Sequence, residues 1–355
     1  MRMKAAVYRG PALFRVEDVP IPEIGPGEML IRVDACGVCV TDVKKIQKGL
    51  LAGPRIFGHE IAGTVARTSA SVAYREGDRV VVHHHIPCRR CFYCAKAAYA
   101  QCEVYKRNGT TAGFEPSGGG FAEYVKAMDW IVARGTIPIP ASVSPAVASF
   151  VEPVNTCLKA VRKAGVARGD TVLVVGQGQI GLLLMQLCRW SGAEVLTSDT
   201  LADRLAISRR LGAAVVLDAH ADDVAREVRA LTDGRGAEVA FVAAPGPLAL
   251  EQAVSATRPG GRIMIFAATS PGETSEVDWG RLCTAEKDIL TSYSSSVDVQ
   301  DMAAQLVFQR EINVADLVTH RVSLEQAPQA VELASKPATG VLKVVLELGG
   351  RVEAS

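Results

Sequence analysis

TVLVVGQGQIGLLLMQLCRWSGAEVLTSD, at residues 171–199, is the stretch that decides the fold of this chain. Its first five residues are apolar and mostly β-branched, which is typical of a strand buried on both faces. The glycines at 176, 178 and 181 predict a tight turn that lets a phosphate approach the backbone. The apolar residues that follow recur at helical spacing and predict a helix packed on the sheet. A pyrophosphate would bind at the N-terminus of that helix, where free N–H groups and the helix dipole attract anions.

Asp199 ends the second strand of this unit, where a carboxylate accepts hydrogen bonds from both hydroxyls of an adenosine ribose. A glycine-rich turn alone also occurs in many structural loops. The preceding strand, the following helix and an acid at this distance together predict a dinucleotide site. Its expected cofactor-binding residues are Gly176, Gly178, Gln179, Ile180, Gly181, Asp199 and Arg204.

The end of the second strand also predicts which dinucleotide is bound. The 2′-phosphate of NADP would bring negative charge against Asp199, whereas the ribose hydroxyls of NAD would donate to it. Arg204 lies five residues on and is within reach of the same ribose, while Arg209 and Arg210 belong to a solvated helix face. These arginines favour NADP, but none of them directly follows Asp199. We therefore expect NAD.

Strands and helices alternate regularly from residue 170 to residue 292. Strands are expected at 172–175, 194–197, 214–217, 238–242, 262–266 and 289–292, with helices such as 201–211 and 223–231 between them. Thr200 is expected to cap the first of these helices, and Gly212 lies just past its end. Six strands with such crossovers predict a doubly wound parallel sheet of the α/β class.

Length and composition exclude several classes of protein. The 355 residues suit two domains, and 48% hydrophobic with 22% charged residues is typical of a globular chain without a membrane span. A net charge of +1 argues against a nucleic-acid-binding surface. The first residues lack the apolar segment of a signal peptide, and nine cysteines favour metal or thiol chemistry over disulfides. We therefore expect a cytoplasmic protein.

The first 35 residues differ from the alternating region. Strand candidates at 5–8, 14–17 and 29–33 are separated by prolines and glycine, which predicts antiparallel β-structure. Thr41 is expected to cap a short helix that ends near Gly49. His59 and Glu60 then open a strand at 61–66.

Cys39, His59 and nearby carboxylates resemble the ligand set of a catalytic zinc. Read alone, Cys39 is more often a small buried hydrophobe, and His59 is more often a hydrogen-bonded core residue. The dinucleotide unit downstream favours the metal interpretation. His83, His84 and His85 cannot all face one ion, because side chains alternate along an extended strand. We interpret them as a strand end with local hydrogen bonds, of which one imidazole could line the substrate cleft.

Four cysteines form the most specific local motif of the chain: Cys88, Cys91, Cys94 and Cys102. Their spacing predicts a closed, tetrahedral thiolate site that suits a structural zinc. An iron–sulfur cluster shares the cysteine chemistry, and disulfides are the second alternative. The bacterial iron–sulfur spacing carries a proline after its last cysteine, whereas Glu103 follows here. The sequence therefore favours zinc.

Glu152 and Pro153 lie just before the helix that leads into the glycine-rich unit. A carboxylate at this junction of two domains could reach a metal held by the first domain. A surface helix cap is the simpler interpretation of Glu152 taken alone. The tail from about residue 293 is expected to return to the first domain through shorter strands and a helix at 324–335.

Taken together, these motifs resemble the zinc-dependent medium-chain dehydrogenase/reductase family of alcohol, polyol and threonine dehydrogenases. The resemblance covers essentially the whole chain and rests on residues 36–42, Gly58-His59-Glu60, the four-cysteine lobe, Glu152-Pro153 and residues 176–199. It implies a Rossmann domain at 153–291, inserted into a GroES-like β-rich catalytic domain made of residues 1–152 and 292–355. It also implies two zinc ions per chain, NAD as cofactor, and a homotetramer or a dimer.

Residue roles follow from the same resemblance. Cys39 and His59 would be catalytic zinc ligands, Glu152 a further ligand, and Glu60 the neighbour that moves onto the metal. Asp42 would orient His59.

The resemblance also implies a proton relay and two cofactor contacts. Thr41 would pass the substrate hydroxyl proton outward, although Lys44 stands where liver-type enzymes have the histidine that completes this relay. Thr156 would pack on the nicotinamide, and Lys343 would lie near the pyrophosphate.

The implied activity is hydride transfer between NAD and a secondary alcohol or polyol. Within the family, the sorbitol/L-iditol branch is favoured by Glu152-Pro153 and by Val40. The polar side chains of residues 293–295 are compatible with a hydroxylated substrate. An L-threonine 3-dehydrogenase and a simple alcohol dehydrogenase are the alternatives, while a formaldehyde dehydrogenase would be longer. A zinc-free quinone or enone reductase would lack Cys39, His59 and the cysteine lobe. A catalytically silent scaffold protein on this fold is the alternative from a different class.

Overall fold

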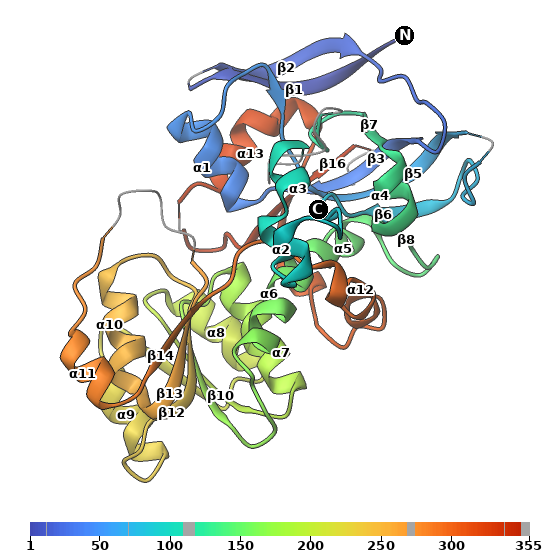
Figure 1. Ribbon diagram of the computed structural model, residues 1–355. Coiled ribbons are helices and arrows are strands. Elements are labelled where there is room, and N and C mark those ends of the chain that lie inside the picture. Colours follow the sequence, from blue (N-terminus) through green and yellow to red (C-terminus); the bar gives the residue numbers. More distant parts are fainter. Residues whose placement is uncertain (12, 70, 109–117, 268–273, 337, 349–355) are drawn as a thin grey trace. The chain divides into compact units, whose positions relative to one another are not determined.

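The computed structural model describes residues 1–11, 13–69, 71–108, 118–267, 274–336 and 338–348. It divides the chain into two compact units (Figure 1). The β-rich unit comprises Met1–Asn155, Ser294–Arg310 and Val314–Ser355, and the parallel-sheet unit comprises Thr156–Tyr293 and Glu311–Asn313. The domain limits after residues 152 and 291 stay a prediction.

The parallel-sheet unit is built on six strands in the order β11-β10-β9-β12-β13-β14, and every neighbouring pair is parallel. Their bounds are β9 (Thr171–Val175), β10 (Glu194–Asp199), β11 (Val215–Asp218), β12 (Ala237–Val242), β13 (Thr257–Ile265) and β14 (Asp288–Thr291). The strand order reverses beside β9, which is the switch point of a doubly wound Rossmann sheet. The predicted α/β class is confirmed.

Helix α6 (Val151–Lys163) leads into β9. The strands are connected in turn by α7 (Gln179–Trp190), α8 (Ala202–Arg210), α9 (Val224–Leu231), α10 (Pro247–Ala256) and α11 (Trp279–Thr284). Helix α7 buries eight consecutive residues from Gly181 to Cys188, as expected of a helix that follows the glycine-rich turn. A separate cluster of buried apolar residues joins the central strands to α9 and α10, and includes Leu173, Leu196, Val228 and Ala253.

The β-rich unit contains a seven-stranded sheet in the order β15-β16-β3-β5-β6-β8, with β7 paired to β3, and a three-stranded sheet β2-β1-β4. The bounds are β1 (Arg2–Gly10), β2 (Leu13–Pro20), β3 (Met29–Gly37), β4 (Arg55–Ile56), β5 (Glu60–Thr68), β6 (Arg79–Val82), β7 (Tyr124–Ala127), β8 (Thr136–Pro138), β15 (Val318–Val322) and β16 (Lys343–Glu347). Only β15 and β16 pair in parallel among these described strands, so the antiparallel character predicted for the first residues is confirmed. Strand β16 pairs with β3, which joins the end of the chain to its beginning.

Seven α-helices accompany these strands in the described part of the β-rich unit: α1 (Val40–Lys48), α2 (Phe92–Ala95), α3 (Glu103–Asn108), α4 (Asp129–Gly135), α5 (Pro145–Ala148), α12 (Gln300–Phe308) and α13 (Ala327–Leu333). The core includes Met29, Ile31, Ile61, Val80 and Phe121, all fully buried. The sequence pattern does not predict α12, because its apolar residues are not confined to one face.

Two helix caps differ from the prediction. The N-cap of α1 is Cys39 rather than Thr41, because the Cys39 sulfur accepts the backbone N–H of Thr41 at 3.4 Å. The N-cap of α8 is Leu201 rather than Thr200, and the Asp199 carboxylate accepts the N–H of Leu201 at 2.9 Å. In both places the side chain that accepts the N–H belongs to a residue earlier in the chain than the predicted cap.

Candidate functional site

Cys39, His59 and Glu60 bring one ligand atom each to a common point, with these atoms within 4.8 Å of one another. Cys39 is held by its place as N-cap of α1, while Glu60 begins β5 directly after His59. His59 and Glu60 are buried and Cys39 is half-buried. A thiolate, an imidazole and a carboxylate in one shielded group are donors that fit zinc. The structure thus brings together three of the four predicted catalytic ligands.

Asp42 stands behind His59, with its Oδ2 3.1 Å from the imidazole Nδ1. Burial lowers the pKa of His59, but the charges of Asp42 and Cys39 outweigh burial and hold this pKa well above its usual value. Two anionic neighbours around one imidazole are the charge pattern of a cation site. Because Asp42 lies at the Nδ1 side, the Nε2 atom is left to face a metal.

Glu60 forms a buried ion pair with Lys343, whose ammonium also donates to the carbonyl of Val38 at 3.2 Å. A Cβ at Gly37 would collide with the Glu60 carboxylate and lie 2.7 Å from Lys343 Cε, so the pair requires glycine there. Burial lowers the pKa of Lys343, and the charge of Glu60 outweighs it and raises this pKa. The sequence predicts no such contact for Lys343, and its role at a pyrophosphate stays a prediction.

Glu152 lies inside the first turn of α6 rather than before it, and it is buried rather than a surface cap. The expected position before the helix is therefore wrong, and the alternative of a surface cap does not hold, while the role of Glu152 as a metal ligand stays a prediction. Pro153 is tolerated beside it, because the first turn of a helix lacks intrahelical N–H partners. Burial raises the pKa of Glu152 to about 7, and the nearby charges of His59 and Lys343 oppose this shift. Among the described residues, Glu152 lies outside the Cys39–His59–Glu60 group of ligand atoms.

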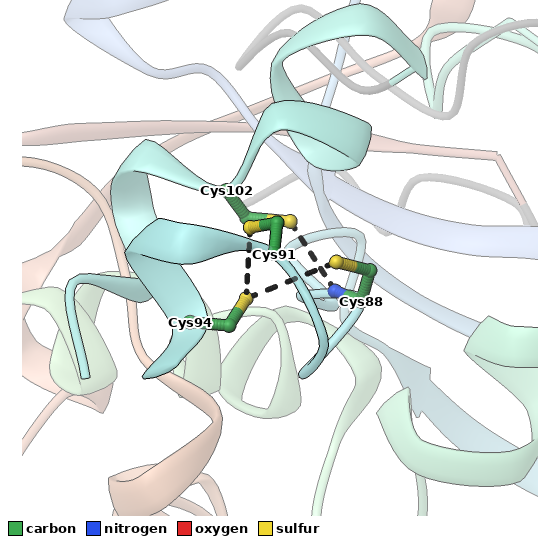
Figure 2. A group of neighbouring side chains, drawn as sticks. All are labelled: Cys88, Cys91, Cys94 and Cys102. Atoms are coloured by element: carbon green, nitrogen blue, oxygen red, sulfur yellow. Dashed lines mark hydrogen bonds between the residues drawn. The ribbon is translucent and has the colours of Figure 1, made fainter. Parts of the chain in front are cut away.

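The second group of ligand atoms consists of the four predicted sulfurs of Cys88, Cys91, Cys94 and Cys102. Figure 2 shows these thiols converging around α2, with the N–H of Cys88 donating to Cys102 Sγ at 3.2 Å. Backbone N–H groups lower the pKa of Cys91 to about 6, whereas burial raises the pKa of Cys94 to about 12. Four sulfurs within 4.8 Å of one another, supported by N–H donors, fit a closed structural zinc site.

The glycine-rich turn of the parallel-sheet unit has the geometry of an anion site. Gly176 has a φ of 92°, and a Cβ at Gly181 would collide with the Gly176 carbonyl. Gly178 is the N-cap of α7 and supplies no side-chain acceptor, so the first N–H groups of α7 can serve a ligand. Gln179 Nε2 is buried without a hydrogen-bond partner in the described ranges. These features fit the pyrophosphate of a dinucleotide.

Asp199 ends β10 as predicted, and its carboxylate is shared between two loops. Its Oδ2 accepts the N–H of Gln177 at 2.5 Å, and its Oδ1 accepts the N–H of Leu201 at 2.9 Å. Arg204 Nη1 lies 3.9 Å from Oδ2, so a cation stands beside the acid. Ile180 lies beside Gln179 in the first turn of α7, and Thr156 is a half-buried residue of α6.

The three consecutive histidines turn to different partners. His83 Nε2 lies 3.0 Å from Ser295 Oγ, and His85 Nδ1 contacts Ser294 Oγ. The serines are 212 and 209 positions away, so the predicted local hydrogen bonds are wrong. His84 instead packs its ring 5.0 Å, centroid to centroid, from that of His59. The side-chain alternation expected from the sequence separates His84 from its two neighbours, although these residues follow β6 rather than belong to it.

Comparison with known proteins shows which family contains a chain with these two groups of metal-ligand atoms and this glycine-rich turn. The alcohol dehydrogenase GroES-like domain model matches residues 25–141, and the zinc-binding dehydrogenase model matches residues 180–309. An L-threonine 3-dehydrogenase of Pyrococcus abyssi is 31% identical over 93% of this chain and 94% of its own length. The chain belongs to the zinc-dependent medium-chain alcohol dehydrogenase family. A sorbitol dehydrogenase of Bacillus subtilis is 29% identical over 97% of both chains.

A solved structure extends this likeness to three dimensions. A zinc-binding dehydrogenase candidate of Sinorhizobium meliloti, bound to NADP, has a TM-score of 0.88 at 30% identity, covering 98% of this chain and 99% of its own. As a member of this alcohol dehydrogenase family, the chain is an oxidoreductase that uses zinc and a nicotinamide cofactor on small molecules. Its fold combines the GroES-like and Rossmann domains.

No helix in the described ranges is both long and apolar enough to cross a membrane.

Proposed function

We propose that this protein interconverts a secondary alcohol or polyol and its ketone, with NAD as the hydride acceptor and two zinc ions per chain. The observation that carries the proposal is the buried convergence of Cys39, His59 and Glu60, backed by Asp42. These residues would hold one zinc, with Glu152 as a further ligand, and the four-cysteine lobe would hold the other. Bound zinc supplies a Lewis acid that lowers the pKa of an alcohol, and NAD accepts the hydride.

The chain's own residues prepare the reaction. Asp42 would orient His59, and the ion pair with Lys343 would hold the Glu60 carboxylate beside the metal site, from which it could move onto the zinc. Thr41, half-buried in the first turn of α1, would accept the substrate hydroxyl proton and pass it outward. The overall change removes two hydrogens from the alcohol, one as hydride to NAD and one as a proton to solvent.

The nucleotide would be held by the parallel-sheet unit. Its pyrophosphate would take the N–H groups at the start of α7, and its ribose hydroxyls would donate to Asp199. Thr156 would pack on the nicotinamide, Arg204 would contact the ribose, and Lys343 would approach the pyrophosphate.

The substrate class is proposed from the polar surroundings of His59. His83 and His85 contact the hydroxyls of Ser295 and Ser294, and such polar groups would suit a hydroxylated substrate better than a hydrocarbon. The names of the two relatives, a sorbitol and a threonine dehydrogenase, give the same class of polar secondary alcohols. We further propose a homotetramer that acts in the cytoplasm.

The test is NADH formation by the zinc-loaded protein with a panel of polyols, simple secondary alcohols and L-threonine. We expect turnover of a polyol or of another polar secondary alcohol, and a rate lowered roughly 10²–10⁴-fold in Thr41→Ala. No turnover of any panel member by a zinc-loaded protein that binds NAD would favour the catalytically silent scaffold. Full activity of Thr41→Ala at neutral pH would exclude the proton relay alone.

A further inference from the structure

Four aromatic rings lie in contact between the four-cysteine lobe and the group around His59. Tyr105 stacks on His85 with ring centroids 3.6 Å apart and planes at 19°. His84 follows at 5.9 Å from His85 and 6.2 Å from Tyr105. His59 is next, 5.0 Å from His84. We call Tyr105, His85, His84 and His59 the ring series, and all four belong to the β-rich unit.

The lobe end of the ring series is tied to the cysteines. Tyr105 lies in α3, three residues after Cys102, and packs with Cys94 and Cys102 in one buried cluster. A metal that fixes Cys102 and Cys94 therefore also fixes the start of α3 and the ring of Tyr105. Exposed lobe aromatics such as Tyr93, by contrast, point to solvent.

The histidine end is fixed by contacts on both sides. The N–H of His83 donates to the carbonyl of Gly135 at 2.6 Å. This bond anchors the backbone directly before His84 and His85 of the ring series. His85 is held by Ser294 on one side and by Tyr105 on the other. His84 is then confined between its neighbours and the ring of His59. Asp42 contacts His59 at Nδ1 and Cys39 is its second hydrogen-bonding neighbour, while the ring of His84 packs against the imidazole and limits its rotation.

We propose that the four-cysteine lobe positions the catalytic ligand His59 through the ring series, with Tyr105 and His84 as positioning residues. The proposal rests on the function proposed above, because it assumes a metal on Cys39 and His59. It gives the lobe a role beyond holding its own loop together. Contacts behind a metal ligand typically change metal affinity by about 10–100-fold when they are lost.

The experiment replaces the more weakly held zinc with Co²⁺ in the full chain and records the visible spectrum and the Co²⁺ affinity. Tyr105→Ala should shift the cobalt bands and weaken Co²⁺ binding by about 10-fold while the lobe zinc stays bound. Tyr105→Phe keeps the ring and should match the wild type. Tyr93→Ala removes an exposed lobe aromatic and is the matched control.

A second route into the ring series keeps the proposal testable if Tyr105→Ala releases the lobe zinc or fails to fold. His84→Leu leaves Tyr105 and the cysteines intact and should produce the same cobalt shift. The double variant should add little to either single variant, because both interrupt one series of contacts. Unchanged bands and affinity in His84→Leu, or in Tyr105→Ala with the lobe zinc bound, would overturn the proposal. Wild-type protein that binds no Co²⁺ beyond what Cys39→Ala binds would instead overturn the proposed function.

Discussion

At the scale of single residues, Asp199 is the position whose contacts bear most directly on cofactor choice. Its two oxygens already accept the N–H groups of Gln177 and Leu201, and Arg204 stands 3.9 Å from one of them. The arginine partly offsets the charge of the acid, but the acid remains the group that a 2′-phosphate would meet. Cofactor preference therefore depends on the balance between these two side chains.

We predict that NAD is preferred over NADP by at least an order of magnitude in kcat/KM, about 1.4 kcal/mol. Asp199→Ala should lose most of this preference. Asp199→Asn should act in the same direction while keeping an oxygen for Gln177, which separates charge from folding. Arg209→Ala, on the exposed face of α8, is the control and should change nothing. Equal kcat/KM for both cofactors in the unmodified protein would show that Arg204 outweighs the carboxylate.

His83 carries a prediction about acid stability. Burial, followed by the charge of His59, lowers the pKa of His83 to about 3, whereas an unfolded imidazole binds its proton near pH 6.5. Between these values the unfolded state binds more protons, so the free energy of unfolding falls as the pH falls. Where the two states differ by one full proton, the free energy of unfolding changes by about 1.4 kcal/mol per pH unit. The wild type should show this pH dependence from His83, and His83→Asn should lack it. Denaturant unfolding of both proteins at a series of pH values below about 6.5 checks this; parallel pH profiles would refute it.

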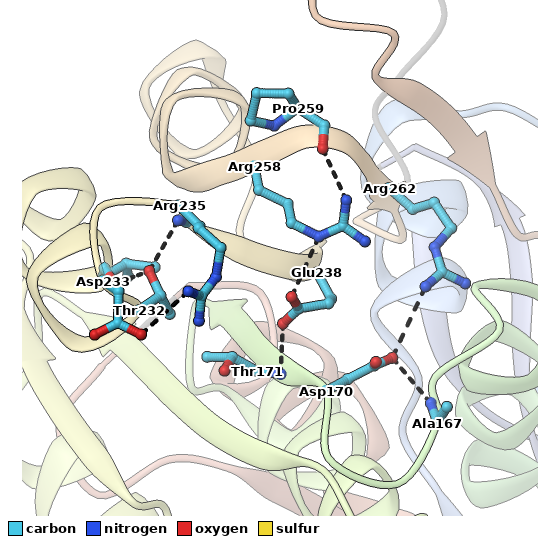
Figure 3. A network of polar contacts seen from close by, with 12 residues as sticks. Ala167, Asp170, Thr171, Thr232, Asp233, Arg235, Glu238, Arg258, Pro259 and Arg262 are labelled. Carbon is cyan, nitrogen blue, oxygen red and sulfur yellow. Dashed lines mark hydrogen bonds and ion pairs between the residues drawn. The ribbon is translucent and has the colours of Figure 1, made fainter.

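At the scale of elements, a polar network binds together the first residues of three parallel strands (Figure 3). Glu238 of β12 accepts the N–H of Thr171 in β9 at 2.8 Å and the Nε–H of Arg258 in β13 at 3.2 Å. Arg262 donates to the carbonyl of Gly165 at 2.9 Å, in the loop that precedes β9. This edge lies at the N-terminal ends of the strands, opposite the glycine-rich turn that follows β9.

Glu238→Ala should therefore lower the free energy of unfolding and leave the affinity for the cofactor unchanged. It leaves the N–H of Thr171 and the guanidinium of Arg258 without this acceptor, which costs about 1–3 kcal/mol in the free energy of unfolding. Arg235→Ala is the matched control, because its ion pair with Asp233 is exposed and such pairs contribute about 0–1 kcal/mol. Thermal unfolding and NADH titration measure the two quantities. A Glu238→Ala protein as stable as Arg235→Ala would contradict the account.

The elements also show why the sequence predicted one unit better than the other. Parallel strands buried on both faces have continuous apolar runs, so β9 and β10 are visible locally, and the four cysteines carry their chemistry in their spacing. The partners of Glu60 and His83 lie far along the chain, at Lys343 and Ser295. No local pattern encodes such contacts, which depend on how β3 meets β5 and β16. The burial of Glu152 could not be predicted from the sequence for the same reason, because its charged neighbours lie before position 61 and after position 342.

At the scale of the whole molecule, we predict a homotetramer. Strand β14 is an edge of the six-stranded sheet, and its Ile289 and Leu290 are only half-buried. An unpaired apolar edge strand is a surface that another copy of the chain can extend or cover. Light scattering at micromolar concentration should give four times the chain mass. A monomer mass would rule this assembly out.

The measurement that bears most directly on the central claim is made on one sample of Cys39→Ala, by counting its zinc and following NADH formation. Cys39 is a half-buried ligand of one proposed metal group and plays no part in the four-cysteine lobe. We predict one zinc per chain where the wild type has two, no detectable NADH formation with the best substrate of the panel, and NAD binding close to that of the wild type. A variant that keeps two zinc ions per chain and wild-type turnover would show that the reaction does not depend on a metal at Cys39.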